Sequence, residues 1–368
     1  MKEKRAAVYL ILMMAALIYG IGFLCMVKEE DKYSYSERRL LAQRPELTIP
    51  ALTEGSFTER FENYGRDQFP FREAFRRLKE GMNLKLLGRL DNNGIYTIDG
   101  QMGKLDYPLH LEQLEYALGR IDSIYEQYLK GKEMKIYLAV IPDKNYYLAD
   151  NEGYPAMDYE ALFSRAKEHA SYATFIELRE ELSAEDYYRT DTHWKQEKLL
   201  PVAKKLLTSM GGAQDARYRQ ETATGEFLGV YAGQSALFQE SEEINYLINE
   251  ELEACRVTVY GEDGAVESRM YDENALGGED AYLFFLSGTQ ALITIENPQA
   301  DSGRELIIFR DSFAASLAPL LAEDYQKITL VDIRYINSTV LGEYLTFSGQ
   351  DVLFLYSSLL LNNSLGMK

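Results

Sequence analysis

The sequence predicts an α/β protein with a mostly parallel sheet flanked by helices. Short apolar runs such as Met134–Ile141 and Leu306–Phe309 are typical of strands that are buried on both faces. They alternate with amphipathic segments such as Leu111–Leu129, in which apolar residues recur at helical spacing. Strands that alternate with covering helices in this way indicate a parallel or mixed sheet.

The N-terminal residues, 1–27, predict a short cytoplasmic tip and a transmembrane helix. Met1–Arg5 is net positive, and Ala6–Val27 is an uncharged run of roughly 22 residues, long enough to cross a hydrocarbon layer of about 30 Å. The basic residues at the start place the tip in the cytoplasm and everything after residue 28 outside. A cleaved signal peptide is the alternative, but the apolar run is long for one and no small-x-small site closes it. Leu24 before Cys25 also does not fit a lipoprotein signal. We therefore expect a single-pass, uncleaved anchor in the cell membrane.

Residues 28–90 are charged and aromatic and predict an extracytoplasmic stalk. The apolar positions fit two short amphipathic helices on either side of a turn at Pro70; they are residues 57, 61, 64, 78, 82, 84 and 87.

Residues 91–368 are expected to form the α/β domain. The interval from about 211 to 278 is acidic and poorly periodic, and we interpret it as a β-rich insertion of hairpins and loops. The predicted helices cover residues 111–129, 159–170, 197–210 and 314–322. The predicted strands cover residues 95–98, 134–141, 173–178, 282–286, 291–296, 304–309, 328–332 and 352–356.

Composition excludes several classes of function. The 368 residues carry a net charge of −19, which argues against nucleic acid or anionic lipid as a partner of the globular part. Cys25 lies in the apolar segment, so a disulfide with Cys255 is not expected; an exported chain without disulfides is consistent with a Gram-positive bacterium. The three histidines are not clustered with cysteines, and we predict no metal site and no cofactor.

Ser312 lies where a buried strand turns into a helix. This serine follows the apolar run 306–309 and precedes the small residues that begin at Ala314. At such a turn a hydroxyl is presented at the carboxyl edge of the sheet, beside free N–H groups of the helix start. Hydrolases place nucleophiles in this position. The alternative is that Ser312, or Asp311, only caps the helix.

Asp191 and His193 form the strongest acid–base pair in the chain. In an extended segment, residues two apart point to the same side, so both side chains can share one face. A carboxylate in that position fixes the imidazole tautomer and stabilises its protonated form, as a general base beside a serine requires. The alternative is a structural histidine next to Trp194, with no catalytic role.

The motifs taken in order resemble the DHHW-motif proteins of Gram-positive bacteria. More distantly, the motifs resemble the alginate O-acetylation proteins of AlgJ and AlgX type, which have a permuted SGNH-hydrolase-like (flavodoxin-like) domain. The resemblance covers nearly the whole exported part, and it rests on residues 37–42, 67–72, 93–96, 141–144, 190–194, 227–229, 311–313 and 331–335.

This resemblance implies a Ser-His-Asp triad in which Asp191 orients the ring, His193 is the base and Ser312 is the nucleophile. The oxyanion donors would be the backbone N–H of Ser312 or Phe313. Lys144, Asn145, Arg334, Phe313 and Trp194 are further candidates for substrate-binding or oxyanion roles. Three residues depart from the family pattern: Thr192, Lys195 and Arg310. Arg310 stands where a Gly-Asp-Ser motif has its glycine.

The function implied is O-acetyl transfer, or acetyl-ester hydrolysis, on a cell-surface polysaccharide of the exopolysaccharide or cell-wall type. A transferase of this kind would depend on a multi-pass membrane-bound O-acyltransferase as its acyl supplier. The alternative, which belongs to another class, is a non-catalytic carbohydrate-binding or assembly protein with the same fold.

Overall fold

The computed structural model describes residues 2–34, 36–213, 215–236, 239–261, 264–278 and 280–368. These residues divide into two compact units. Unit 1 holds residues 2–92 with 232–236, and unit 2 holds residues 93–231 with 239–368.

Unit 2 is built on an eight-stranded mixed sheet in the order β10-β9-β11-β13-β12-β14-β5-β6. Five neighbouring strands, from β13 to β6, pair in parallel, whereas β11, β9 and β10 pair antiparallel at the other side. The strand bounds are β5 Ile136–Ile141, β6 Thr174–Ile176, β9 Arg256–Gly261, β10 Gly264–Ser268, β11 Leu292–Glu296, β12 Glu305–Arg310, β13 Lys327–Val331 and β14 Asp351–Ser357. The predicted mostly parallel sheet is confirmed.

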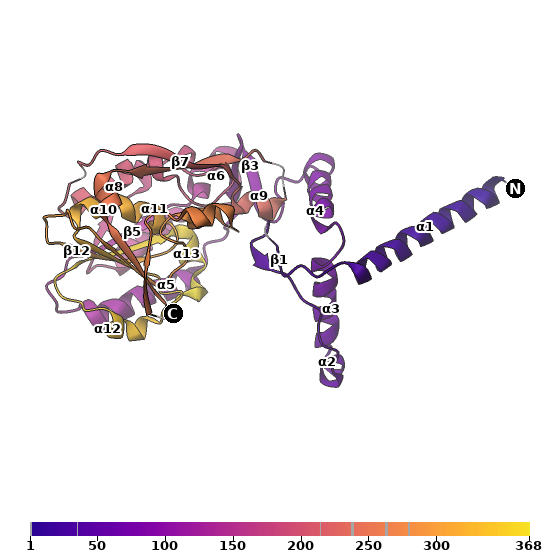
Figure 1. Cartoon of the computed structure of the whole chain (residues 1–368), viewed down its shortest axis with the longest axis horizontal. Helices are drawn as coiled ribbons and strands as arrows, with labels where there is room; N and C mark the ends of the chain where they lie inside the picture. The colour runs from indigo at the N-terminus through magenta and orange to yellow at the C-terminus, as the bar shows by residue number, and fades with distance from the viewer. Residues whose placement is uncertain (1, 35, 214, 237–238, 262–263, 279) are drawn as a thin grey trace. The chain divides into compact units, whose positions relative to one another are not determined.

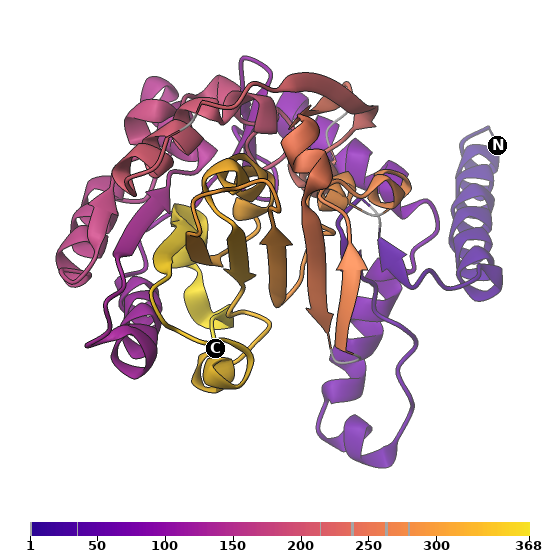
Figure 2. The same ribbon diagram turned by 60° about the vertical axis from the view of Figure 1, so that its left-hand side comes forward.

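Helices cover both faces of this sheet (Figures 1 and 2). The side chains of α8 and α11 join the apolar core on one face, and those of α5, α7, α12 and α13 join the core on the other. Strands β12 and β14 are buried on both faces, which explains their continuous apolar sequences. The helix bounds are α5 Leu111–Ile124, α6 Lys144–Glu152, α7 Tyr159–His169, α8 Leu200–Ser209, α10 Glu250–Ala254, α11 Ala314–Leu317, α12 Leu341–Tyr344 and α13 Ser358–Asn362.

Within the described part of unit 2, two antiparallel strand pairs lie outside the large sheet. Strands β3 (Ile95–Ile98) and β4 (Gln101–Lys104) form one, and β7 (Arg219–Phe227) and β8 (Glu242–Ile248) form the other, with α9 (Val230–Ser235) between β7 and β8.

Three sequence predictions need correction. Residues 282–286 are not a strand, because Ala281–Phe284 is a 3-10 helix whose first turn is capped by Asp280. The interval 211–278 is not only an insertion, since β9 and β10 extend the central sheet. The helix expected at residue 197 begins at Leu200, where Pro201 occupies the first turn; a separate 3-10 turn precedes it.

Unit 1 contains the apolar N-terminal helix and the short elements that follow it. Helix α1 (Lys2–Val27) includes Arg5–Val27, whose length and mean hydropathy of 2.5 suffice to cross a membrane. A helix of this length and composition could serve as an N-terminal anchor or as a signal segment. The remaining elements are β1 Tyr33–Ser34, β2 Arg39–Leu40, α2 Ile49–Thr53, α3 Ser56–Asp67 and α4 Arg72–Gly81, which continues as a π-helical turn, Met82–Leu86. The two helices predicted around Pro70 are thus confirmed as α3 and α4.

The centre of the sheet should dominate the stability of unit 2. Leu353 of β14 is fully buried, so Leu353→Ala should lower the free energy of unfolding by about 2–5 kcal/mol. Leu365 is 76% exposed, and the matched change Leu365→Ala should stay within about 0.5 kcal/mol. Denaturant unfolding of the two variants, followed by the emission of buried Trp194, measures both effects. Equal losses in the two variants would contradict this assignment of the core.

Candidate active site

The candidate residues gather at the edge of the sheet where the parallel strands end. Strand β12 ends at Arg310 and α11 begins at Ala314, so Ser312 lies in the turn between them. Strand β13 lies on one side of β12 and β14 on the other. In open α/β sheets, ligand sites form outside the carboxyl ends of strands where the chain departs to both sides.

Asp311, and not Ser312, makes the cap-like contact at this turn. The Asp311 carboxylate accepts hydrogen bonds from Phe313 N–H at 3.1 Å and from Ser357 N–H at 2.8 Å, which ties the turn to the end of β14. The hydroxyl of Ser312 is therefore free of helix capping. It lies 2.8 Å from Nε2 of His193 and is partly exposed, whereas the histidine is buried.

Asp191 reaches the other nitrogen of the His193 ring. Its Oδ1 lies 2.7 Å from Nδ1 and also accepts the backbone N–H of His193 at 3.0 Å. A side chain that bonds the backbone two residues on is an Asx turn, so this segment is bent and not extended as expected. The predicted proximity is present, but its cause is the turn.

The hydrogen bonds assign the histidine tautomer. A carboxylate only accepts hydrogen bonds, so the neutral His193 ring carries its proton on Nδ1 and donates it to Asp191. The Nε2 atom is then the acceptor for the Ser312 hydroxyl. With this polarity, a proton can move from the serine oxygen to the histidine.

The second carboxylate oxygen of Asp191 is held by the start of α9. Val230 N–H donates to Oδ2 at 2.8 Å, and Gly229 N–H donates to the Thr190 hydroxyl at 2.9 Å. Asp191 is fully buried, so the Val230 N–H takes the place of water at this carboxylate oxygen.

Tyr282 completes the site and was missed by the sequence reasoning. Its ring stacks on His193 at a centroid distance of 3.8 Å and an interplanar angle of 9°. Its hydroxyl lies 2.8 Å from Ser316 Oγ, which in turn accepts from Trp194 Nε1 at 2.9 Å. No spacing in the sequence signals this contact, because Tyr282 comes from a different loop and its surroundings resemble a strand.

Lys144 is buried beneath the Asp191 loop, which corrects its predicted role as a substrate or oxyanion contact. Its Nζ donates to the carbonyl oxygens of Tyr188, Arg189 and Asp191 at 2.7, 3.1 and 3.0 Å. An ammonium group has three donors, one for each carbonyl. Burial lowers the pKa of Lys144 to about 7, despite the opposing charge of Asp191.

Three other residues that were candidates for substrate binding or oxyanion stabilisation are also engaged in contacts within the fold. Asn145 is buried and accepts a hydrogen bond from the Tyr96 hydroxyl. Trp194 is fully buried and donates to Phe313 O at 3.0 Å, which joins the histidine loop to the serine turn. Arg334 forms a two-point ion pair with Asp332, with bonds of 2.9 and 2.6 Å. Among the described residues, no hydrogen bond joins any of these three side chains to Ser312, whose hydroxyl pairs with His193.

The turn offers one open backbone donor to an oxyanion. Phe313 N–H is occupied by Asp311, whereas Ser312 N–H has no acceptor among the described residues. Arg310, in the place of the motif glycine, is buried and points to Gln290 O at 3.2 Å. Phe313 is thus excluded as the backbone donor in this conformation, while its ring lies 4.9 Å from that of His193.

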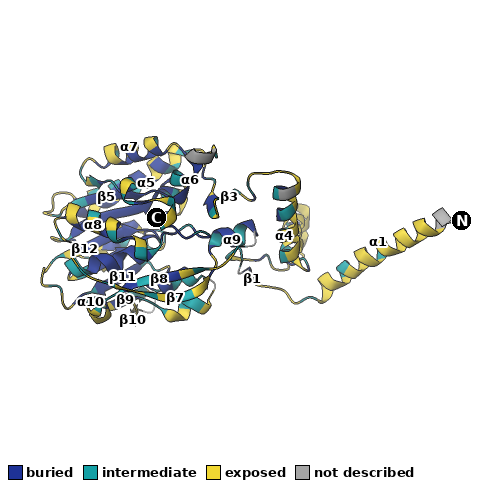
Figure 3. Ribbon diagram, turned by 90° about the horizontal axis from the view of Figure 1, so that it is seen from above, coloured by how far each residue is buried: buried dark blue, intermediate teal, exposed yellow. Residues whose placement is uncertain are grey.

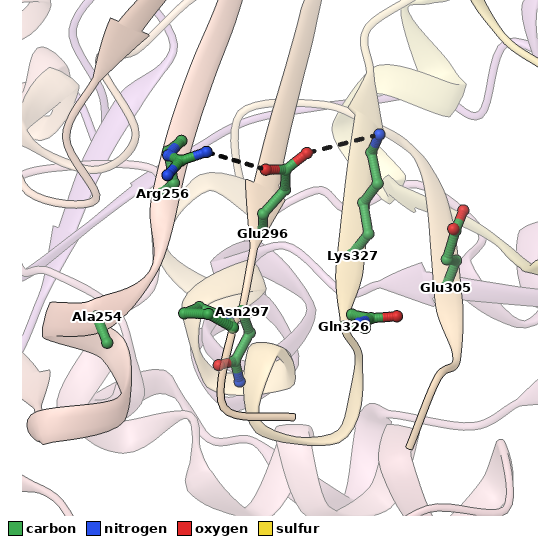
Figure 4. A pocket seen from close by; sticks show the side chains of 8 residues that line it. Ala254, Arg256, Glu296, Asn297, Glu305, Gln326 and Lys327 are labelled. Carbon is green, nitrogen blue, oxygen red and sulfur yellow. Dashed lines mark ion pairs between the residues drawn. The ribbon is translucent and has the colours of Figure 1, made fainter. Parts of the chain in front are cut away.

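A separate pocket of about 350 Å³ lies at the other end of the strands from Ser312 (Figure 4). It is lined where β9, β12 and β13 begin, by residues that include Arg256, Glu305 and Lys327. Glu296 lies 3.9 Å from both Arg256 and Lys327, a spacing typical of weak surface ion pairs. This pocket and Ser312 are at different ends of the same strands. Among the described residues, no group of three or more His, Cys, Asp and Glu side chains is placed to hold a metal.

Solved structures share this fold. A DHHW family protein from Eubacterium siraeum matches with a TM-score of 0.62 at 22% identity, over 75% of this chain and 95% of that one. Bacillus cereus PatB1 matches with a TM-score of 0.61 at 19% identity, over 73% and 96% of the two chains. PatB1 with a sulfonyl adduct gives 0.59 at 19% identity, over 73% and 95%.

The O-acetyltransferase domain of Pseudomonas putida AlgJ is more distant, with a TM-score of 0.45 at 11% identity over 73% and 92% of the chains. No protein-family model and no curated protein sequence matches this chain. The expected relation to DHHW-type proteins is confirmed at the level of the fold, since this chain shares its fold with a DHHW family protein and with PatB1.

Gly229 is required for the position of Asp191. A Cβ at this residue would collide with Asp191 Cβ and with the Thr190 carbonyl oxygen. Gly229→Ala should therefore displace Asp191 and abolish the downfield NMR signal of the hydrogen-bonded His193 Nδ1 proton. Gly225→Ala is the matched control, because a Cβ there meets nothing within 4 Å. An unchanged signal in both variants would show that the loop tolerates the methyl group.

The buried Lys144 should make stability depend on pH. Its folded pKa of about 7 lies below its ordinary value, so above pH 7 the unfolded chain binds a proton that the folded chain has released. Stability then rises with pH, and the cost of burying the charge is fully present only below pH 7.

The difference in unfolding free energy between wild type and Lys144→Met should therefore increase from pH 7 to 10, by at most about 1.4 kcal/mol per pH unit. Denaturant titrations at several pH values measure this difference. The exposed Lys198→Met is the control, since its side chain stays in water in both states. If the difference in unfolding free energy between wild type and Lys144→Met does not change with pH, the lowered pKa of the buried Lys144 amine is contradicted.

Proposed function

We propose that this chain is a membrane-anchored, extracytoplasmic acyl-transfer enzyme that moves an acetyl group onto or off a cell-surface polysaccharide. Ser312 is the nucleophile, His193 the general base and acid, and Asp191 the group that orients the ring. The observation that carries the proposal is the continuous hydrogen-bonded line from Asp191 through both ring nitrogens to Ser312, at 2.7 and 2.8 Å.

The first half-reaction forms an acetyl-serine. Ser312 Oγ attacks the carbonyl carbon of the acetyl donor while its proton passes to His193 Nε2. The C–O or C–S bond to the leaving group then breaks, and His193 returns the proton to that group. Ser312 N–H, which has no acceptor among the described residues, would stabilise the oxyanion, and buried Asp191 would stabilise the imidazolium.

The second half-reaction decides between two activities. A sugar hydroxyl gives its proton to His193 and attacks the acetyl-serine carbonyl. The bond from the acetyl carbon to Ser312 Oγ then breaks and His193 returns the proton to Oγ, which yields an O-acetylated polysaccharide and free Ser312. Water in the same position yields acetate, which is the esterase reaction. One of the PatB1 structures carries a sulfonyl adduct, and sulfonyl reagents react with activated hydroxyl groups, so this chemistry offers a direct probe.

The proposed cellular location of the chain follows from helix α1. As an uncleaved anchor this helix places the catalytic unit outside the cell membrane, consistent with its length and hydropathy. An activated acetyl group would then have to be delivered across the membrane, and a multi-pass membrane-bound O-acyltransferase is the partner class that supplies one.

The second candidate is a carbohydrate-binding or assembly protein without turnover. It is favoured by the occupied N–H of Phe313, which leaves one backbone donor at the turn, and by buried Arg310 in the place of the motif glycine. Loss of one oxyanion donor typically lowers the rate by about 10²–10³.

A covalent-labelling experiment separates the two candidates. The full chain in detergent is treated with an activated acetyl ester and, separately, with a sulfonyl fluoride, and adducts are mapped by mass spectrometry. We expect a single adduct on Ser312, absent in Ser312→Ala and formed roughly 10²–10⁴-fold more slowly in His193→Ala.

Ser302→Ala is the control, since Ser302 lies in an exposed turn away from this site. An adduct that is indifferent to both active-site substitutions, or no adduct at all, would support the binding protein instead. Adding an oligosaccharide acceptor to the acetylated enzyme then distinguishes transfer from hydrolysis.

A further inference from the structure

Helix α4 of unit 1 exposes its apolar face. Phe71, Phe75, Leu78 and Met82 recur at helical spacing and are 70%, 48%, 58% and 47% exposed. We call these four side chains the outer stripe. Figure 3 shows exposed positions along α4. A helix of a globular protein ordinarily directs such a stripe into the core.

The charged face of the same helix is directed inward and is fixed by named contacts. Arg72 pairs with Glu37, and Arg76 donates to Ser36 Oγ at 3.0 Å and to Gly233 O at 2.7 Å. One turn further on, Glu80 is 1% exposed and accepts a hydrogen bond from Asn92. Rotating the helix to bury its apolar stripe would break all of these contacts, so the outward orientation is built into unit 1.

The outer stripe begins close to the end of α1. Gln68 Nε2 donates to Asp31 O at 2.7 Å, and Asp31 N–H donates back to Gln68 Oε1 at 2.9 Å. Asp31 is the fourth residue after Val27, where α1 ends. An extended chain spans at most about 3.6 Å per residue, so Gln68 lies within roughly 15–20 Å of the end of α1. The stripe starts three residues after Gln68.

The distribution of charge along the sequence also distinguishes the segment that contains this stripe from the rest of the chain. Residues 28–92 carry 13 Lys and Arg against 12 Asp and Glu, whereas residues 93–368 carry 23 against 45. Lys79 lies at the margin of the stripe and Arg77 lies further round the helix, and both are exposed. Basic residues at the margins of an apolar helical face are typical of helices that lie in a membrane interface.

We propose that α4 lies in the outer interface of the lipid bilayer, with the outer stripe in the boundary between headgroups and acyl chains. Arg77 and Lys79 then face lipid phosphates. This inference rests on the proposed anchoring by α1, which delivers α4 to that surface. In consequence, unit 1 contacts the membrane at two places, through α1 and through α4. It is then not a flexible linker that is attached at one end only.

Lipid-borne quenching tests the position of α4. The full chain, with Cys25→Ser and Cys255→Ser and one new cysteine carrying an NBD fluorophore, is reconstituted into vesicles of phosphatidylcholine and phosphatidylglycerol. Doxyl-labelled lipids quench a fluorophore only if it contacts the acyl region. We expect blue-shifted, quenchable emission at Leu78→Cys and Met82→Cys, with weaker quenching at Arg77→Cys.

Glu62→Cys on α3 is the control, since Glu62 is exposed and outside the outer stripe. Red-shifted, unquenched emission at Leu78→Cys would overturn the proposal. Blue-shifted but unquenched emission would also overturn it, because the stripe would then be covered by protein, either unit 2 or another chain. Vesicle flotation of the same samples reports anchoring by α1 separately, so loss of flotation marks failure of the anchor and not of the α4 interface alone.

Discussion

The buried carboxylate of Asp191 is the constraint on which the rest of the candidate site depends. A buried charge without hydrogen-bond donors is very costly, so a loop can hold this group only if its neighbours supply them. The chain does so from two directions: His193 donates through its ring and its backbone, and Val230 donates at the start of α9. Lys144 holds the backbone of the same loop through the carbonyl oxygen of Asp191. Each of these contacts fixes the loop and, with it, the direction in which the histidine ring points.

The histidine is then held between the two segments that it must connect. Tyr282 stacks on one side of its ring, and Phe313 lies against it at an angle. Trp194 reaches from the histidine loop to the carbonyl of Phe313 in the serine turn. The ring is therefore positioned by packing before any substrate arrives, and positions fixed in advance are what acid–base catalysis requires. The same contacts explain why Trp194 and Phe313, expected near a substrate, are buried.

In unit 1, polar contacts and not apolar packing fix the orientation of a helix. Ion pairs and hydrogen bonds hold the charged face of α4 and leave its apolar face in contact with solvent. In a protein without a membrane nearby, such a surface would favour aggregation. Under the proposed anchoring by α1, this surface would be a second point of attachment, which would limit how far unit 2 can move from the membrane.

The sequence by itself determined the elements whose signals are local. Buried strands such as β12 and β14 are apolar throughout because both of their faces are covered, and the serine turn follows from the abrupt change from Phe309 to Arg310-Asp311-Ser312. The pairing of Asp191 with His193 was also readable, because two residues so close in sequence can meet whatever the fold.

Only the tertiary structure decided the contacts between distant segments. It brought His193 and Ser312, 119 residues apart, within 2.8 Å and gave the capping contact to Asp311. It also buried Lys144 beneath three carbonyl groups and placed Tyr282 on the ring. The motif resemblance implied that His193 and Ser312 meet, but the capping contact of Asp311, the burial of Lys144 and the stacking of Tyr282 have no sequence signature, because a side chain's partners depend on which strand edge its loop follows. The direction of α4 was undetermined for the same reason: periodicity predicts that a helix has an apolar face, but the packing of its charged face decides where that apolar face points.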